Sequence, residues 1–286
     1  LHNLTITATD STGLTALTSL SLRINTPPPA STIVLSPDPV NSTDTLSATV
    51  TSSGDADGDT ITNTYAWYED SVLTALTGST VSAADLDVGE TWTVRVTPND
   101  GYVDGSFSEE SITVSNSDPS ITSVSITPNT SVYNDSVLTC TSTATDDDET
   151  VTATIEWTVG TAIYTGASLD LSNTATMPTD IITCTASVSD SNGGSDSSST
   201  TVTIDNRSPS VSSINISPSI AVLTDSTLTC SATVTDDDGE SLTPTYEWIV
   251  NSASLGASDT LTLSSSTVQP GDVLSCTANV NDNYGN

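Results

Sequence analysis

The residues best suited to chemistry in this sequence are acidic side chains that recur in short clusters. The clusters lie about 90 residues apart along the chain. They consist of Asp55, Asp57 and Asp59; of Asp146, Asp147, Asp148 and Glu149; and of Asp236, Asp237, Asp238 and Glu240. Carboxylates held together repel one another unless they are protonated or bridged by a cation. Calcium is the expected cation, because it takes roughly six to eight oxygen ligands from carboxylates, amides and carbonyls in flexible geometry.

The composition argues against catalysis and against nucleic-acid binding. The single histidine, His2, lies near the N-terminus, there is no lysine, and no nucleophile is paired with a base. Acidic residues repeated on equivalent loops do not form one unique cleft, so we expect no enzymatic activity. With 36 acidic residues and only three arginines the net charge is −33, which repels phosphate backbones and anionic lipid.

Short alternating runs predict the elements that position these clusters. Residues 46–50 and 200–204 alternate apolar and polar side chains with a period of two, which is typical of half-buried strands. Strong acidity with few aromatic residues also fits disorder, but the regular alternation favours ordered β-structure. No stretch approaches the ~20 apolar residues that cross a membrane, and no signal segment opens the sequence.

An internal repeat sets the domain organisation. Trp67, Trp157 and Trp248 lie 90 and 91 residues apart, each in a similar phrase such as Tyr-x-Trp. The copies span 30–116, 119–206 and 209–286, and the third stops before its last strand. Residues 1–26 match the C-terminal strands of a preceding copy. We therefore expect a piece of a longer chain; the alternative is that the N-terminal strands complete the last repeat of a neighbouring chain by strand donation.

Four cysteines indicate the fold of the copies. Cys140 and Cys184 lie 44 residues apart in the second copy, and Cys230 and Cys276 lie 46 apart in the third. Each pair brackets its tryptophan with the Cys…Trp…Cys spacing of an immunoglobulin-like (Ig-like) sandwich, which predicts two disulfides and an oxidising, extracellular location. A metal site would need a CxxC pair or a histidine partner. In the first copy Ala48 and Val94 take the equivalent positions.

The copies resemble tandem bacterial and archaeal Ig-like repeats of the PKD or cadherin-like type, found in large surface proteins. The Tyr-x-Trp phrase, the acidic clusters, Asn99-Asp100-Gly101 and the linkers Asn25-Thr-Pro27, Asn116-Ser-Asp-Pro119 and Asn206-Arg-Ser-Pro209 carry the resemblance. The Trp-Asp-Phe-Gly-Asp phrase of typical PKD repeats is absent. The fold expected is all-β, with tandem Ig-like β-sandwich domains arranged as an elongated rod.

In such a sandwich the acidic B–C loop, the F–G loop and the incoming linker meet at one end, so acidic groups converge at each junction. Calcium there would stiffen the rod, as in cadherin-like proteins; the alternative is a solvated acidic loop that keeps the surface soluble. Asn25 lies in the first linker. The expected ligands are Asp55, Asp57, Asp59, Asp100, Asn116, Asp118, Asp146, Asp148, Asp190, Asp205, Asn206, Asp236, Asp238, Glu240 and Asp282.

Three functions remain open at the level of sequence. The first is a spacer, stalk or filament segment of an exported cell-surface protein, whose partners are neighbouring repeats and possibly like chains. The second is an adhesin that binds glycans or another cell, for which Tyr68, Trp92, Tyr102 and Phe107 are the candidate residues, although the strand position of Trp92 favours the core. The third is an accessory module attached to a secreted enzyme.

Overall fold

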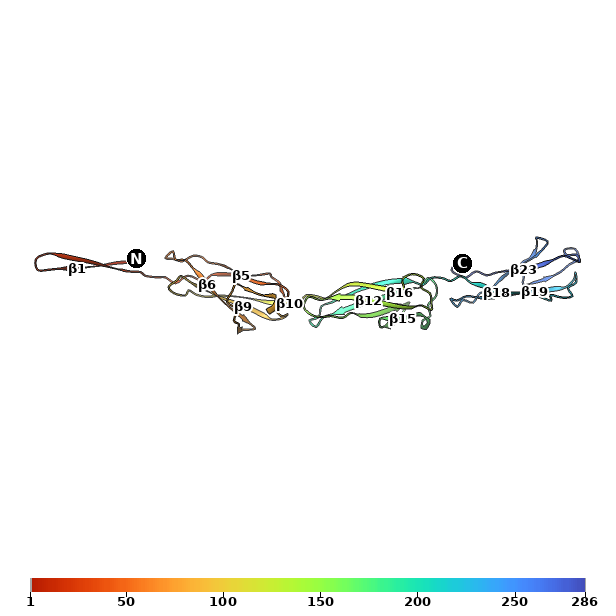
Figure 1. Ribbon diagram of the computed structural model, residues 1–286, viewed down its shortest axis with the longest axis horizontal. Helices are drawn as coiled ribbons and strands as arrows, with labels where there is room; N and C mark the ends of the chain where they lie inside the picture. The colour runs from red at the N-terminus through yellow and green to blue at the C-terminus, as the bar shows by residue number, and fades with distance from the viewer. Residues whose placement is uncertain (1, 286) are drawn as a thin grey trace. The chain divides into compact units, whose positions relative to one another are not determined.

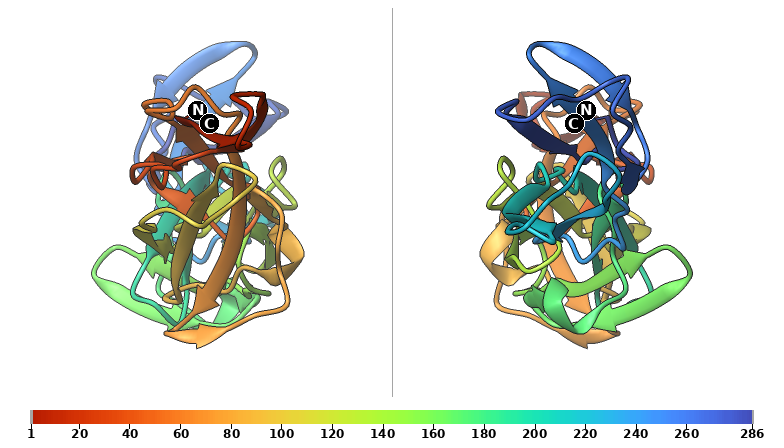
Figure 2. Two further views of the ribbon diagram at one scale, coloured as in Figure 1. Left: turned by 90° about the vertical axis from the view of Figure 1, so that its left-hand side faces the viewer. Right: turned by 90° about the vertical axis from the view of Figure 1, so that its right-hand side faces the viewer.

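A computed structural model describes residues 2–285, and Leu1 and Asn286, where the outermost expected domains begin and end, lie outside the described residues. The ribbon consists of strands and connecting loops, with two short 3₁₀ turns (Figure 1 and Figure 2). None of the helical segments in this range is long and apolar enough to cross a membrane. The chain forms two compact units: residues up to Pro119 with Thr145–Val151 and Ser189–Ser195, and Ser120–Ala144 with Thr152–Val188 and the residues from Asp196 onward.

The first unit begins with an antiparallel hairpin of β1 (His2–Thr9) and β2 (Thr15–Leu22). Its tight turn forms because Asp10 Oδ1 accepts the backbone N–H groups of Thr12 and Leu14, at 2.8 and 3.0 Å. Leu4 and Leu20 face each other across the pair. Both side chains are exposed, so this apolar face has no second sheet against it in the described structure.

Two sheets form a first sandwich in the same unit. One has the order β3 (Thr32–Ser36), β5 (Leu46–Thr51) and β8 (Thr80–Val81). The other runs β4 (Val40–Asn41), β10 (Ser108–Ser115), β9 (Thr91–Asn99), β6 (Thr62–Glu69) and β7 (Val72–Leu73), and the 3₁₀ turn is Ala83–Asp85. Burial alternates along β9, so that Trp92, Val94 and Val96 enter the core. Trp92 meets Trp67 edge-to-face at 6.3 Å, which confirms the expectation that Trp92 belongs to the core.

The second unit contains two further sandwiches. In the second sandwich β11 (Ser120–Thr127), β12 (Val137–Thr145) and β15 (Ser168–Asp170) face β14 (Ala162–Thr165), β13 (Thr154–Val159), β16 (Ile181–Ser189) and β17 (Ser195–Thr203), with a 3₁₀ turn at Leu171–Asn173. In the third, β18 (Ser210–Ser217), β19 (Thr227–Thr235) and β22 (Thr260–Thr262) face β21 (Ala253–Gly256), β20 (Thr245–Val250) and β23 (Leu274–Asn279).

The strand register confirms that the three copies are equivalent. Trp157 and Trp248 lie directly opposite Cys184 and Cys276, and Trp67 lies opposite Val94. Both expected disulfides are present, Cys140–Cys184 and Cys230–Cys276. The chain is therefore all-β, with Ig-like sandwiches in which a bridge or an Ala–Val pair fills the same place beside a buried tryptophan.

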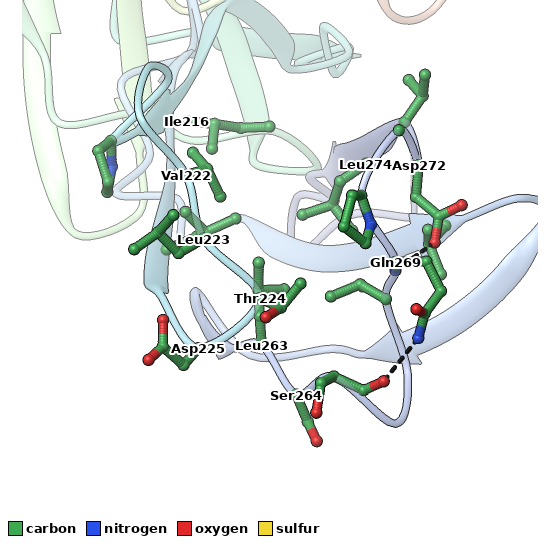
Figure 3. A pocket seen from close by; sticks show the side chains of 18 of the residues that line it. Ile216, Val222, Leu223, Thr224, Asp225, Leu263, Ser264, Gln269, Asp272 and Leu274 are labelled. Carbon is green, nitrogen blue, oxygen red and sulfur yellow. Dashed lines mark hydrogen bonds between the residues drawn. The ribbon is translucent and has the colours of Figure 1, made fainter.

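The third sandwich differs from the others at one edge. In the first two, the last strand brings Val114 (β10) or Val202 (β17) into the core. Among the residues up to 285 no strand follows β23, and an open groove lies there, lined by apolar side chains that include Val222, Leu263 and Leu274 (Figure 3).

Candidate metal centres at the junctions

Each acidic loop is shaped by its first aspartate. The loops connect β5 to β6, β12 to β13 and β19 to β20. One carboxylate oxygen of the first aspartate accepts the backbone N–H two residues later, the local turn that aspartate favours. These bonds are Asp57 N to Asp55 Oδ1 (2.8 Å), Asp148 N to Asp146 Oδ1 (2.8 Å) and Asp238 N to Asp236 Oδ1 (2.7 Å).

The same aspartates each keep one buried oxygen without a partner. Oδ2 of Asp55, of Asp146 and of Asp236 is shielded from solvent and accepts no hydrogen bond within the described residues. Buried polar atoms are normally paired, because an unpaired one forfeits its hydration without compensation. The same unpaired oxygen therefore recurs at three equivalent positions.

Beside each acidic loop, a linker asparagine contacts the F–G loop, which is the loop that follows β9, β16 or β23. Its amide nitrogen donates to an aspartate: Asn25 to Asp100 (2.7 Å), Asn116 to Asp190 (2.8 Å) and Asn206 to Asp282 (2.6 Å). We call these places the first, second and third junctions. The amide oxygen of all three asparagines is buried and has no hydrogen-bond partner in the described structure. Turning the amide over would bring that oxygen against the carboxylate, so the observed orientation is the favoured one.

The second aspartate of each loop holds the linker backbone. Its Oδ2 accepts the N–H of the residue after the asparagine: Thr26 to Asp57 (2.6 Å), Ser117 to Asp148, and Arg207 to Asp238 (2.6 Å). The two aspartates of a loop thus have different roles. One leaves an oxygen free for a ligand, and the other fixes the linker.

The third junction brings the most acidic oxygens together. Carboxylate oxygens of Asp236, Glu240 and Asp282 lie within 4.8 Å of one another. Glu240 Oε2 is also buried without a hydrogen-bond partner in the described part of the chain. Carboxylate oxygens are the ligands that calcium prefers, and the nearby linker residue Asn206 has a buried, unpaired amide oxygen of its own.

Hydrogen bonding keeps the F–G carboxylates ionised. The amide of Asn25 lowers the pKa of Asp100, assisted by backbone N–H groups of its own loop. The amide of Asn116 lowers the pKa of Asp190 in the same way. Both groups therefore carry negative charge at neutral pH, which favours a cation at the junction.

Two expected ligands have other partners. Asp59 pairs with Arg23, whereas Asp118 stays beside the F–G loop: its Oδ1 and Asp190 Oδ2 both lie against the place that a Cβ on Gly194 would take. Asp205 Oδ2 accepts the N–H of Val132 at 3.2 Å, because neighbouring residues of an extended chain point in opposite directions and Asn206 takes the inward one. The structure thus pairs the linker asparagine with the F–G aspartate at every junction and brings Asp236 and Glu240 to Asp282 at the third. Asp59 and Asp205 lie outside these groups.

The second acidic loop departs from the other two. Gly58 and Gly239 have φ values of +79° and +87°, a conformation that glycine adopts readily. Glu149 takes the equivalent position in the second loop. Its carboxylate accepts a hydrogen bond from the backbone N–H of Ser191 at 2.6 Å.

Two arginines and one serine complete the junctions and were not expected from the sequence. Arg23 pairs with Asp59 and stacks on Tyr102, at 4.2 Å. Arg207 binds Asp238, and the hydroxyl of Ser42 binds Asp148. The scarcity of cations was the available signal, because two of only three arginines lie within two residues of a linker asparagine.

A separate surface patch lies on the first sandwich. Arg95 stacks on Phe107 at 4.3 Å and on Tyr68 at 5.3 Å, and its guanidinium pairs with Glu109 at 2.8 Å. Phe107 and Tyr102 are exposed. This patch combines aromatic faces with a charged group.

Comparison with known proteins gives likeness of architecture only. No family model and no curated protein match the chain. Similar solved structures include a Ca²⁺-stabilized adhesin with which an Antarctic bacterium binds ice, 15% identical over 98% of this chain and 80% of that one, with a TM-score of 0.40. A 1.5-MDa bacterial ice-binding adhesin is 18% identical over 92% and 95%, with a TM-score of 0.38. Three N-terminal domains of the outer capsid protein Hoc of bacteriophage RB49 are 17% identical over 88% and 91%, with a TM-score of 0.28. Because these TM-scores lie below 0.5, the function proposed below rests on the residues of this chain.

Proposed function

We propose that this chain is a spacer segment of an exported cell-surface protein, a row of Ig-like repeats of the PKD or cadherin-like type held in series by calcium at their junctions. The repeats are 30–116, 119–206 and 209–286, preceded by the last strands of another repeat in 1–26. One observation carries the proposal: a linker asparagine and the first aspartate of the acidic loop each leave a buried oxygen unpaired at all three junctions.

The ligands we propose at each junction are the linker asparagine, the first aspartate and the F–G aspartate. They are Asn25, Asp55 and Asp100; Asn116, Asp146 and Asp190; and Asn206, Asp236 and Asp282, with Glu240 added at the third junction. A divalent cation at this position would join the linker to two loops of the following sandwich. It would thereby restrict rotation about the linker, which is the mechanical property that a spacer needs.

The chemistry of the rest of the chain agrees with an extracellular structural role. The two disulfides join core strands within sandwiches, and such bonds persist in oxidising surroundings. The net charge of −33 keeps repeated surfaces apart from one another and from anionic membranes. The conserved architecture of the copies, with loops that differ, favours spacing over catalysis, so we propose no enzymatic activity.

Small-angle scattering and thermal unfolding, in millimolar calcium and again in excess chelator, test this function. Chelation is expected to reduce the maximum dimension, increase flexibility and lower the melting temperature. A matched control is the double variant Asp147→Ala, Asp237→Ala, because the equivalent residue of the first loop is Ala56. The control should respond to calcium as the unmodified chain does. Identical scattering and melting with and without calcium would contradict the proposal.

A second candidate function is adhesion through the patch around Arg95, Tyr68 and Phe107. Exposed aromatic rings beside a charged group favour it, and the equivalent faces of the other copies contain no phenylalanine. A glycan array with the unmodified chain and with Phe107→Ala separates the candidates. Binding that Phe107→Ala abolishes supports adhesion, whereas the absence of binding leaves the spacer role.

A further inference from the structure

We infer that Arg207 is a fixed-charge clamp that keeps the second and third sandwiches joined at the third junction when no divalent cation is present. This role rests on the proposed function, in which neighbouring sandwiches are held together at each junction. All the contacts that carry it lie within the second unit.

Arg207 bridges groups from both sandwiches. On the side of the third sandwich its backbone N–H donates to Asp238 Oδ2 at 2.6 Å and its Nε donates to Asp238 Oδ1 at 3.0 Å. On the side of the second sandwich its two terminal nitrogens donate to both oxygens of Asp135, at 3.2 and 2.8 Å. One of them also donates to Asn134 Oδ1 at 3.0 Å, and the guanidinium lies 4.6 Å from the Tyr133 ring centre.

The burial of Asp238 and the number of hydrogen bonds that Arg207 makes mean that another side chain could not readily replace this arginine. The Asp238 side chain is fully buried, with 0% of its surface exposed, and a buried carboxylate without a counter-charge is strongly destabilising. The guanidinium side chain makes four hydrogen bonds here, to Asp238, Asp135 and Asn134, whereas an ammonium group has only three N–H donors and no planar fork. Asn134 strengthens the link, since its amide nitrogen donates to the backbone carbonyl of Asp238 at 2.8 Å.

The charge of Arg207 is permanent. An arginine guanidinium stays protonated under all conditions in which the chain is folded, and Asp135 and Asp238 both lie against it. Among the described residues, the second junction contains no arginine in this place. There the equivalent aspartate, Asp148, is bound by the backbone N–H of Ser117 and the hydroxyl of Ser42, which are both neutral.

Trypsin gives a direct assay because the chain contains no lysine and only three arginines. Cleavage after Arg207 reports opening of the clamp, and cleavage after Arg95, in the middle of β9, reports unfolding of the first sandwich. Fragments are identified by mass at short times, in calcium and in chelator. We expect Arg207 to remain protected in chelator for as long as Arg95. Rapid cleavage at Arg207 in chelator, with protection restored by calcium, would overturn the inference and leave the calcium proposal standing.

Two variants separate the fixed charge from its geometry. Arg207→Lys keeps the charge and the tryptic site but loses the planar fork, and cleavage there is expected to be on the order of tenfold faster in chelator. Asp135→Asn removes one partner that is 62% exposed, so a few-fold increase is expected. Asp225→Asn, a surface change away from the junction, should leave the rate unchanged. Equal rates for Arg207→Lys and the unmodified chain would show that the guanidinium does not act as a clamp. If calorimetry detects no calcium binding while Arg207 stays protected, the proposed calcium role fails and the clamp remains.

Discussion

Replacing Cys140 by alanine and Cys184 by valine removes the disulfide of the second sandwich while filling the core as the first sandwich does. Ala48 and Val94 occupy those positions beside Trp67, and both are buried. The double variant therefore retains side chains that a neighbouring copy already packs in this place. What it loses is mainly the cross-link between β12 and β16.

The expected cost follows from the length of the closed loop. A separation of 44 residues corresponds to about 4 kcal/mol in the chain-entropy model of disulfide stabilisation. For a sandwich of this size that loss lowers the melting temperature by roughly 15–30 °C. The first sandwich, which folds around Ala48 and Val94, is expected to keep its own transition.

Urea unfolding at fixed calcium concentration, followed by tryptophan fluorescence, measures this effect. Trp157 lies opposite Cys184 and reports the second sandwich, whereas Trp67 and Trp92 report the first. Adding reductant to the variant should leave the transition of its second sandwich unchanged. If the urea midpoint of the second sandwich does not fall in the variant, the reasoning is refuted. The disulfide would then add no stability beyond that of an Ala–Val pair.

Three further predictions concern single groups. Trp157→Phe removes the hydrogen bond from the indole nitrogen to the Gly166 carbonyl (2.9 Å) and is expected to cost the second sandwich about 1–3 kcal/mol in urea unfolding; no loss would show that the bond is not needed. The pKa of Asp170, held down by the Ser172 hydroxyl, and that of Asp272, held down by Asn251, lie below the ordinary value of 3.8, so their stabilisation is present above that pH and is lost as the pH falls through the lowered values. Melting in chelator between pH 5 and pH 2 checks this, and a flat profile would contradict it. Asp205→Ala removes the acceptor of the buried Val132 N–H and should lower stability without changing calorimetric calcium binding, whereas loss of one bound calcium would identify Asp205 as a ligand.

Much of the fold follows from spacing in the sequence. The tryptophans and cysteines recur at fixed intervals because they occupy one layer of the core, so their alignment also identified Ala48 and Val94 as the pair that replaces a bridge. The acidic loops could be located in the same way. A fixed spacing along the sequence identifies the residues that take equivalent positions in the repeated sandwiches.

The roles of individual carboxylates could not be derived from composition. Asp236 and Asp238 are the same residue type in the same loop, but the turn that Asp236 makes with its own loop leaves one of its oxygens unpaired, while Asp238 reaches the linker. Asp205 points away from the junction because its neighbour Asn206 points toward it. The contacts of Arg207 depend on a long side chain that spans two sandwiches, which no local pattern reveals.

Calorimetric titration of calcium into the calcium-free chain tests the central claim most directly. The unmodified chain is compared with Asp55→Asn, Asp146→Asn and Asp236→Asn, each of which removes one charge next to an unpaired oxygen and keeps the shape of the side chain. Asp147→Ala and Asp237→Ala serve as controls.

We expect saturable heat from the unmodified chain and the controls, and the loss of one class of sites in each asparagine variant. No saturable heat from the unmodified chain, or equal heat from all variants, would contradict calcium binding at the junctions.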